Sequence, residues 1–260
     1  MALTNKTIAS TYGDILQVDN SGSGRTANGT VVKDGLGQST ALTLGGDKIK
    51  ITPSTDSTTA VTVETSGGTD LLVVDTTNSL IKAGTTQTYV NTQTERFTAN
   101  SSSGTSDGTH TSMFIEATFF GALAPATFGT GTDPATTYSL GASETDALGL
   151  NMSMWYIPAA MTIDEVRVIG SGAAAESLNF HLFSYDMASG TGSGAGDLSN
   201  GTLLAHNGST LTIGNDRITT TTLTIDSANV AADKVVIATF ENVGGTGDVH
   251  AQLTVKYHYQ

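Results

Sequence analysis

Five histidines carry the widest range of chemistry in this sequence, because an imidazole can act as an acid, a base or a metal ligand. They are His110, His181, His206, His250 and His258. Their spacing contains no His-Glu-x-x-His motif of a zinc-binding helix. His250 and His258 share one predicted strand and lie roughly 27 Å apart along it, too far to bind one metal. We expect solvent-facing histidines and no metal or other cofactor, although copies of one histidine could meet on the axis of a trimer.

Residue patterns for nucleophilic catalysis and for nucleotide binding are missing. The sequence has no cysteine and no Gly-x-Ser-x-Gly nucleophile motif. The glycine-rich stretch 188–201 lacks the lysine and the helix that follow a phosphate-binding loop, so we interpret it as a mobile surface loop. Within it, Asp197 and Asn200 carry oxygen atoms of the kind that calcium accepts. A plain turn explains the same residues.

Paired carboxylates could hydrolyse a glycosidic bond, and Asp164 and Glu165 are the pair that the sequence places together. Neighbouring residues of a strand point to opposite faces, so these two make a poor catalytic pair. We expect no enzymatic activity. A small polysaccharide depolymerase stays an alternative, because a working pair of carboxylates need only be close in space.

The composition favours many short strands. Charged residues make up 13% of the chain, against roughly 25% in ordinary domains. Glycine, serine and threonine replace them, and these residues suit turns and half-exposed strands. The net charge of −13 and the scarcity of lysine and arginine exclude nucleic acid as an expected partner. No secretory signal and no apolar run long enough to cross a bilayer is visible, so we expect no membrane insertion.

The first ninety residues change from helical to strand periodicity. Ile8, Tyr12, Ile15 and Leu16 have the spacing of one face of a short helix. From residue 31 to residue 90 the apolar residues alternate with polar ones between glycine-rich or Asp-Asn turns, which predicts small hairpins. Such hairpins are too small to be stable alone. They could pack on their own chain, but we favour a shaft whose apolar face is covered by two identical neighbours.

The remaining residues predict a connector and a larger β domain. The polar stretch 91–110 is interpreted as a linker. Residues 111–260 contain eight candidate strands, which suggests a two-sheet sandwich of jelly-roll type. The candidate strands are 113–119, 150–157, 162–169, 177–187, 202–206, 217–225, 233–241 and 248–259.

Aromatic residues are the remaining candidates for binding. The strand 177–187 is apolar on both faces, so we expect Phe183 and its neighbours to pack at a trimer interface. The other interpretation is a platform for sugar rings made by Tyr185 together with Trp155 or Tyr156. Trp155 is the one tryptophan, and it could equally anchor the core.

Four stretches of the sequence resemble proteins of tailed bacteriophage particles. LTNKTIASTYGDILQVDNSGSG (3–24) and VVKDGLGQSTALTLG (31–45) look like the N-terminal modules of tail-fibre proteins from marine tailed phages. TSGGTDLLVVDTTNSLIKAG (65–84) is similar to the β repeats in the shafts of such fibres. Residues 152–206, which begin MSMWYIPAAMTIDEVRVIGSG, resemble the globular distal domains of phage virion proteins.

The resemblance implies an all-β fibre subunit that works as a homotrimer on the surface of the phage particle and is synthesised in the host cytoplasm. Its parts would be a virion-attachment segment (1–30), a β shaft (31–90), a linker (91–110) and a jelly-roll head (111–260). Its partners would be other virion proteins of the tail or capsid and a glycan or protein of the host cell surface. A capsid decoration or head-fibre protein is the alternative.

These expectations assign three groups of residues. The residues expected to attach to the virion are Ile8, Tyr12, Ile15 and Leu16. Those expected at the trimer interface are Val61, Val63, Leu72, Val74, Leu80 and Phe183. The candidate receptor contacts are Trp155, Tyr156, Tyr185, Ser193, Asp197 and Asn200, the last three in the loop 188–201, because loops on a rigid scaffold often carry binding.

Overall fold

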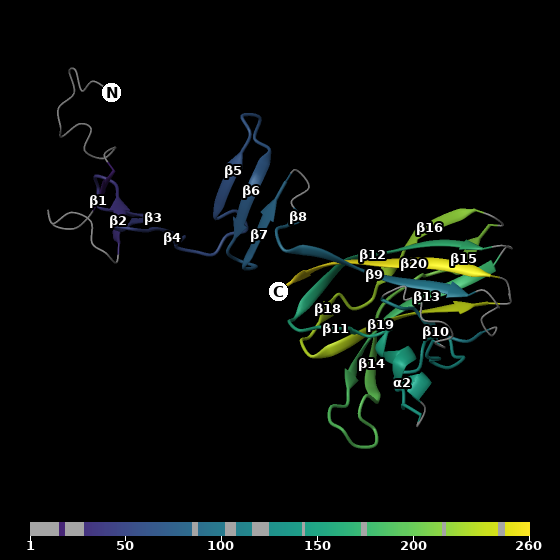
Figure 1. The fold of residues 1–260 in the computed structure, drawn as a ribbon. Helices are drawn as coiled ribbons and strands as arrows, with labels where there is room; N and C mark the ends of the chain where they lie inside the picture. The colour runs from purple at the N-terminus through teal and green to yellow at the C-terminus, as the bar shows by residue number, and fades with distance from the viewer. Residues whose placement is uncertain are drawn as a thin grey trace. The chain divides into compact units, whose positions relative to one another are not determined.

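The computed structural model of the chain describes residues 16–18, 29–84, 88–101, 108–115, 125–141, 144–172, 176–214, 217–243 and 248–260. The chain forms two compact units, Met1–Val90 and Asn91–Gln260. Figure 1 shows that strands dominate both units, with α2 (Glu144–Asn151) as the one helix of the described part. The predicted all-β class is confirmed. Within the same residues, no helix has the length and apolar character to span a membrane.

The first unit begins with a four-stranded antiparallel sheet in chain order. Its strands are β1 (Gln17–Val18), β2 (Thr30–Lys33), β3 (Ser39–Leu44) and β4 (Ile49–Ile51). The Asp34 carboxylate closes the β2–β3 turn by accepting hydrogen bonds from the backbone N–H groups of Leu36 and Gln38 at 3.0 and 2.8 Å. Gly37 sits in this turn at a φ of +83°, which a side chain would disfavour.

A second four-stranded sheet follows in the same unit. It contains β5 (Val61–Glu64), β6 (Asp70–Asp75), β7 (Leu80–Ala83) and β8 (Thr88–Tyr89). The predicted glycine turn joins β5 to β6, with a hydrogen bond of 2.9 Å from Thr65 N to Thr69 O. The Asp75 carboxylate forms the next turn by accepting from the backbone N–H and the side-chain amide of Asn78 at 2.9 and 2.8 Å. Two of the predicted small hairpins, β5–β6 and β6–β7, are therefore present.

The second unit is a sandwich of two antiparallel sheets. In the seven-stranded sheet, the path runs β10 (Thr111–Ser112), β19 (Lys234–Asn242), β13 (Glu176–Met187), β14 (Leu198–His206) and β17 (Thr224–Ile225). Two short strands join this sheet: β11 (Trp155–Tyr156) pairs with β19, and β15 (Leu211–Ile213) pairs with β13. The five-stranded sheet runs β16 (Ile218–Thr222), β12 (Met161–Gly172), β20 (Val249–Tyr259) and β9 (Thr92–Ser101), with β18 (Asn229–Val230) beside β12.

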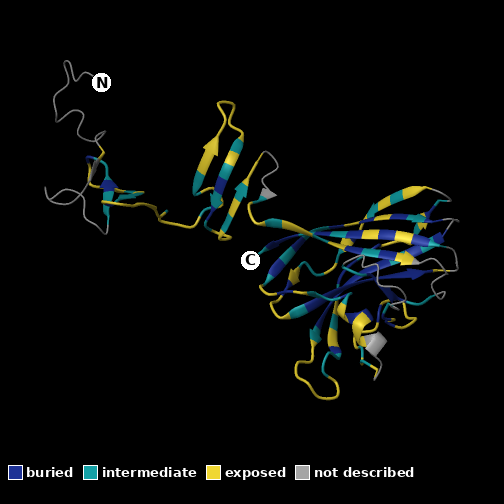
Figure 2. Ribbon diagram, in the orientation of Figure 1, coloured by how far each residue is buried: buried dark blue, intermediate teal, exposed yellow. Residues whose placement is uncertain are grey.

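One core fills the space between the two sheets. Val166 and Val168 of β12 and Leu253 and Val255 of β20 pack in one buried cluster with Phe180 of β13. Figure 2 shows the buried residues concentrated in the strands of this sandwich. The alternation predicted for the last strand is confirmed in β20, whose residues from Val249 to Tyr257 alternate between buried and more exposed positions.

The predicted linker 91–110 is the main difference from expectation. Residues 92–101 form β9, which pairs with β20 over ten positions, so this segment is an integral edge of the sandwich. Phe97 and Ala99 face the core, and Thr98 between them lies on the outer face. Threonine suits the exposed side of a strand, and a polar stretch can therefore be a strand rather than a connector.

Three predicted strands also differ from those observed. Of the expected strand 150–157, only Trp155 and Tyr156 form a strand, β11, and the first two residues belong to the end of α2. The expected strand 217–225 divides at Leu223 into β16 and β17, which belong to different sheets. Of the expected strand 113–119, Phe114 forms an isolated bridge with Thr98, and residues 116–119 lie outside the described part.

Candidate assembly faces and binding surfaces

Six apolar residues of β5, β6 and β7 share one face of the second small sheet. The register places Val61 opposite Val74 and Val74 opposite Ile81. It likewise places Val63 opposite Leu72 and Leu72 opposite Ala83. Paired residues of a sheet share a face, so these side chains form one continuous apolar surface. We call it the shaft face; its members are Val61, Val63, Leu72, Val74, Ile81 and Ala83.

The described residues of one chain cover the shaft face only in part. Val63 and Ile81 are 49% and 50% exposed. The opposite face of the sheet is partly closed by its own residues, because Val73 is buried and the Lys82 ammonium lies 5.9 Å from the centre of the Tyr89 ring. Lys82 also pairs with the buried Asp75 at 3.6 Å. Hydrogen bonds from Asn78 and the charge of Lys82 lower the pKa of Asp75.

Four of the shaft residues assigned to a trimer interface lie on this one face: Val61, Val63, Leu72 and Val74. Leu80 does not, because it pairs with Asp75 and therefore shares the opposite face. Its neighbour Ile81 lies on the shaft face instead, at the position expected for Leu80. The adjacent apolar pair Leu80 and Ile81 leaves the face undetermined in the sequence, and the Asp75–Asn78 turn decides it.

The β1–β4 sheet repeats the pattern. Leu42 pairs with Ile51 and Leu44 with Ile49, so four apolar side chains share one face, while Lys50 pairs with Thr43 on the other. Ile49 is 71% exposed. The predicted attachment residues Ile8, Tyr12 and Ile15 lie outside the described part. The fourth predicted attachment residue, Leu16, is described and 66% exposed.

Phe183 and Tyr185 are buried by their own chain, which overturns two assignments. Both belong to a second core cluster on the outer side of the seven-stranded sheet, together with Phe128, Leu150, Leu198 and Ile237. The Tyr185 hydroxyl donates to the carbonyl of Ala135 at 2.9 Å, and burial raises its pKa. The segment around Phe128 covers this face of β13. Phe183 is therefore no interface residue, and Tyr185 cannot contact a receptor.

Trp155 also faces the core. Its ring makes edge contacts with Phe97 and Tyr257, with ring centres 6.4 and 4.8 Å apart. It packs against the core between the sheets and is only partly exposed. The interpretation of Trp155 as a core anchor fits this geometry better than a sugar-stacking role.

Two other candidate receptor residues meet at one end of the seven-stranded sheet. Tyr156 is half exposed, and its hydroxyl donates to Asp233. The hydrogen bond to Asp233, followed by the charge of this carboxylate, raises the pKa of Tyr156. Next along β19, Lys234 pairs with Asp186, which also accepts from the amide of Asn200 at 2.7 Å. We call Tyr156, Asp186, Asn200, Asp233 and Lys234 the polar end.

The loop between β13 and β14 is tied down by hydrogen bonds. Ala188 N donates to Asp197 O, and Gly196 N donates to Ala188 O, each at 2.8 Å. The Asp197 carboxylate accepts from Leu140 N at 2.8 Å. Asp197 thus fixes the loop to a neighbouring segment rather than standing free for a ligand, and Ser193 lies exposed in the loop.

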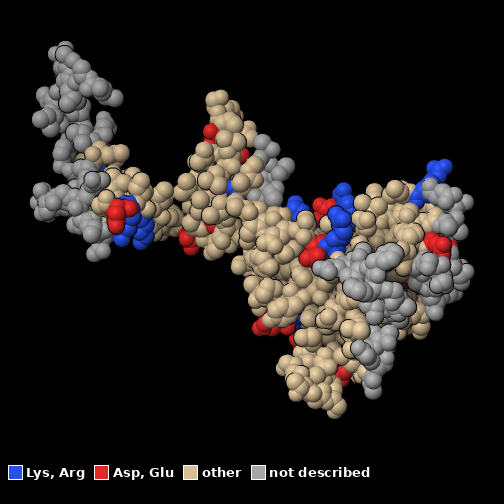
Figure 3. Space-filling view, viewed as in Figure 1, with Lys and Arg blue, Asp and Glu red and all other residues tan. Residues whose placement is uncertain are grey.

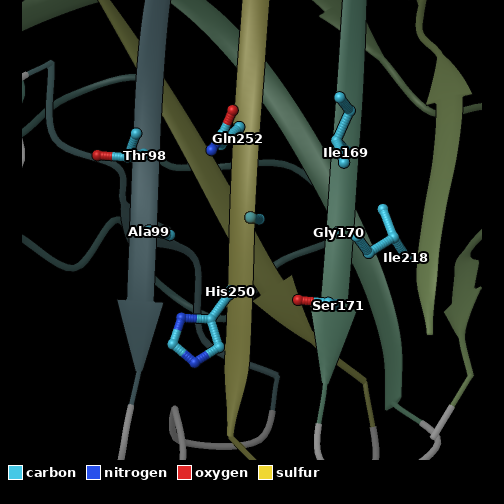
Figure 4. Close-up of a pocket in the computed structure, with 9 residues that line it drawn as sticks. Thr98, Ala99, Ile169, Gly170, Ser171, Ile218, His250 and Gln252 are labelled. Carbon is cyan, nitrogen blue, oxygen red and sulfur yellow. The ribbon is translucent and has the colours of Figure 1, made fainter. Parts of the chain in front are cut away.

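A groove crosses the outer side of the five-stranded sheet (Figure 4). It measures about 480 Å³. One wall consists of Thr98, Gln252 and Ile169, and the other of His250, Ser171 and Ile218, with the backbone of Ala99, Ala251 and Gly170 between them. No pattern in the sequence predicted this groove, because its residues come from four strands far apart in the chain. Amide, hydroxyl and imidazole groups beside two exposed isoleucines can bind a sugar ring through hydrogen bonds and apolar contact.

Charges lie beside the groove rather than in it. The register puts Arg96 and Arg167 on either side of Thr254. Arg167 pairs with Glu165 at 3.0 Å, and Figure 3 shows Lys and Arg atoms next to Asp and Glu atoms over this part of the sheet. The groove itself is therefore suited to an uncharged ligand.

The expectation of solvent-facing histidines is right for His250 and wrong for His258. A bulge at Asp164 in β12 turns its carboxylate toward the imidazole of His258, 2.9 Å away, and both side chains are largely buried. Asp164 and Glu165 thus each bind a basic side chain. His110 and His181 are also buried, beside the partly exposed His206. Among the described residues, no group of three or more acidic or histidine side chains has metal-binding geometry.

The chain matches no protein-family model and no curated protein. Its function must therefore be argued from the faces and surfaces described above.

Proposed function

We propose that this chain is the structural subunit of a fibre on a tailed bacteriophage particle, and that three copies assemble through the Met1–Val90 unit. The observation that carries the proposal is the shaft face, an apolar sheet surface on which Val63 and Ile81 are about half exposed in a single chain. An exposed apolar sheet face of this kind is typical of a surface that is covered in an assembly.

The β1–β4 sheet supports the same conclusion independently. Its apolar face, with Ile49 and Ile51 exposed, also has no cover among the residues that the structure describes. Two successive small sheets with one open apolar face each favour a repeated shaft over a single accidental patch. The number three comes from the resemblance of residues 65–84 to the shaft repeats of trimeric fibres.

The Asn91–Gln260 unit is the proposed head. Along the chain its strands pass repeatedly from one sheet to the other, as in a jelly roll, and its core is complete within one chain. We assign host-surface recognition to the polar end, to the loop around Ser193 and to the groove near Gln252, where sugar rings could bind. Attachment to other virion proteins is assigned to the N-terminal residues, of which Leu16 is exposed.

Sedimentation equilibrium or native mass spectrometry of the purified full chain tests the proposal. The expected particle contains three copies and persists on dilution. A folded single copy at micromolar concentration would contradict the proposed assembly. Labelling of particles with an antibody against the head then distinguishes a tail fibre from a capsid fibre.

A further inference from the structure

Three histidines form a row on the outer side of the seven-stranded sheet. His181 of β13 lies directly opposite His206 of β14, and their rings stack with centres 6.2 Å apart and planes 12° apart. His110, just before β10, meets His181 edge to face at 4.9 Å. Segments far apart in the sequence thus bring three imidazoles into direct contact.

Two of these imidazoles hold the same short loop, residues 129–135. The Nε2 atom of His110 lies 2.8 Å from the carbonyl oxygen of Gly131. The Nε2 atom of His181 lies 3.4 Å from the Asp133 carboxylate. The backbone fixes the ends of the loop, since His110 N donates to Gly129 O at 2.9 Å and Ala135 N donates to Phe128 O at 2.7 Å. The side chains of His110 and His181 therefore secure the middle of the loop.

The other nitrogen atoms of these two rings are buried. The Nδ1 atoms of His110 and His181 are buried and have no hydrogen-bond partner among the described residues. Thr239, opposite His181 in β19, also has a buried hydroxyl without a partner in that part of the chain. A proton added to either Nδ1 atom would create a buried donor, which is costly without an acceptor.

The charged groups around the row give only partial compensation. Asp133 faces His181, and Asp226 accepts from His206 at 2.7 Å. Glu241 lies 4.0 Å from His110 but also accepts from the Asn179 amide at 2.9 Å. Burial, followed by the nearby His110, lowers the pKa of His181 to about 4, although Asp133 opposes the shift.

We propose that the His110–His181–His206 row is an acid-sensitive clasp, which holds the loop 129–135 on the sheet at neutral pH and releases it on acidification. With the clasp closed, His181 stays neutral. With the loop released, His181 is hydrated and takes up a proton near the ordinary histidine value of about 6.5. Each proton bound only in the open form favours opening as the pH falls from about 6.5 toward 4.

Amide hydrogen exchange of the full chain, compared at pH 7 and pH 4.5, tests the clasp. Rates are divided by the intrinsic rate at each pH, so that only structural opening remains. The expected result is a loss of protection on the order of tenfold or more in peptides covering 125–141 at pH 4.5. Peptides from β12 and β20 should keep their protection. An equal loss in β12 and β20, or no loss in 125–141, would overturn the proposal.

Variants separate the histidines from general acid effects. His181→Gln should keep the protection of 125–141 within about twofold between the two pH values. His181→Phe retains a ring against His110 and gives the same comparison if the glutamine variant does not fold. His250→Gln changes an exposed histidine of the other sheet and should behave like the parent protein. A parent-like loss of protection in both His181 variants would also overturn the proposal.

Discussion

Thr62 and Val63 are neighbours in β5, yet they lie on opposite faces of the β5–β8 sheet, paired with Val73 and Leu72 respectively. Both side chains are exposed in a single chain. One position belongs to the shaft face and the other does not. Substitutions at these two positions can therefore test assembly, because the two residues are neighbours, are both exposed and differ in the face of the sheet on which they lie.

Val63→Asp should dissociate the assembly, because a carboxylate buried between apolar faces costs several kcal/mol. Thr62→Asp should leave the three-copy mass unchanged. Sedimentation of both variants beside the parent measures the difference, and circular dichroism checks that the strands remain. Equal masses for the two variants would contradict the role of the shaft face.

Phe183→Ala should destabilise the second unit by about 3 to 4 kcal/mol, the usual cost of truncating a buried phenylalanine. The number of copies in the assembly should not change, since Phe183 is covered within one chain. Denaturant unfolding followed by Trp155 fluorescence reports on this unit alone, because Trp155 is the one tryptophan. Met187→Ala, at an exposed position of the same strand, is the control and should cost little.

Alkaline pH should weaken the sandwich through Tyr257. Burial, followed by the hydrogen bond and charge of Tyr259, raises the pKa of Tyr257 to about 12. The unfolded chain releases this proton near pH 10, so stability is full below pH 10 and falls as the pH rises toward 12. The expected loss is about 2 kcal/mol. Unfolding curves at pH 9 and 11.5 should show a smaller decrease for Tyr257→Phe than for the parent, and an equal decrease would contradict this assignment.

Removal of residues 190–195 should preserve assembly and weaken attachment to host cells. The hydrogen bonds between Ala188 and the residues Gly196 and Asp197 allow the shortened loop to close as a tight turn. Binding of labelled protein to cells that the particle infects is the measurement. Tyr156→Ala at the polar end is a second probe of the same surface. Full attachment by both variants would leave the groove near Gln252 as the remaining recognition surface.

The sequence predicted those features that depend on neighbouring residues. Period-two alternation identified β20 with its buried face, and turn residues such as Asp75, Asn78 and Gly68 located the hairpins. It failed where long-range packing decides. The polar β9 is a strand because β20 pairs with it, and Phe183 is covered because the segment around Phe128 folds over it.

The candidate sites show the same contrast between features that neighbouring residues determine and features that long-range packing determines. Val61, Val63, Leu72 and Val74 share a face because local alternation determines it. The groove near Gln252 and the histidine row gather residues from distant strands. No pattern along the chain could have joined His110, His181 and His206, since only the register of β13 with β14 and β19 brings them together.

The pairing of β9 with β20 sets the order in which the Asn91–Gln260 unit can form. These two strands are separated by nearly the whole second unit, and β20 also supplies the long partner of β12. Neither β9 nor β12 can complete its ladder on the ribosome until β20 has emerged. Contacts between such distant segments form slowly, so we expect the Asn91–Gln260 unit to fold late. Until it folds, the unpaired edges of its strands should be prone to aggregation during synthesis.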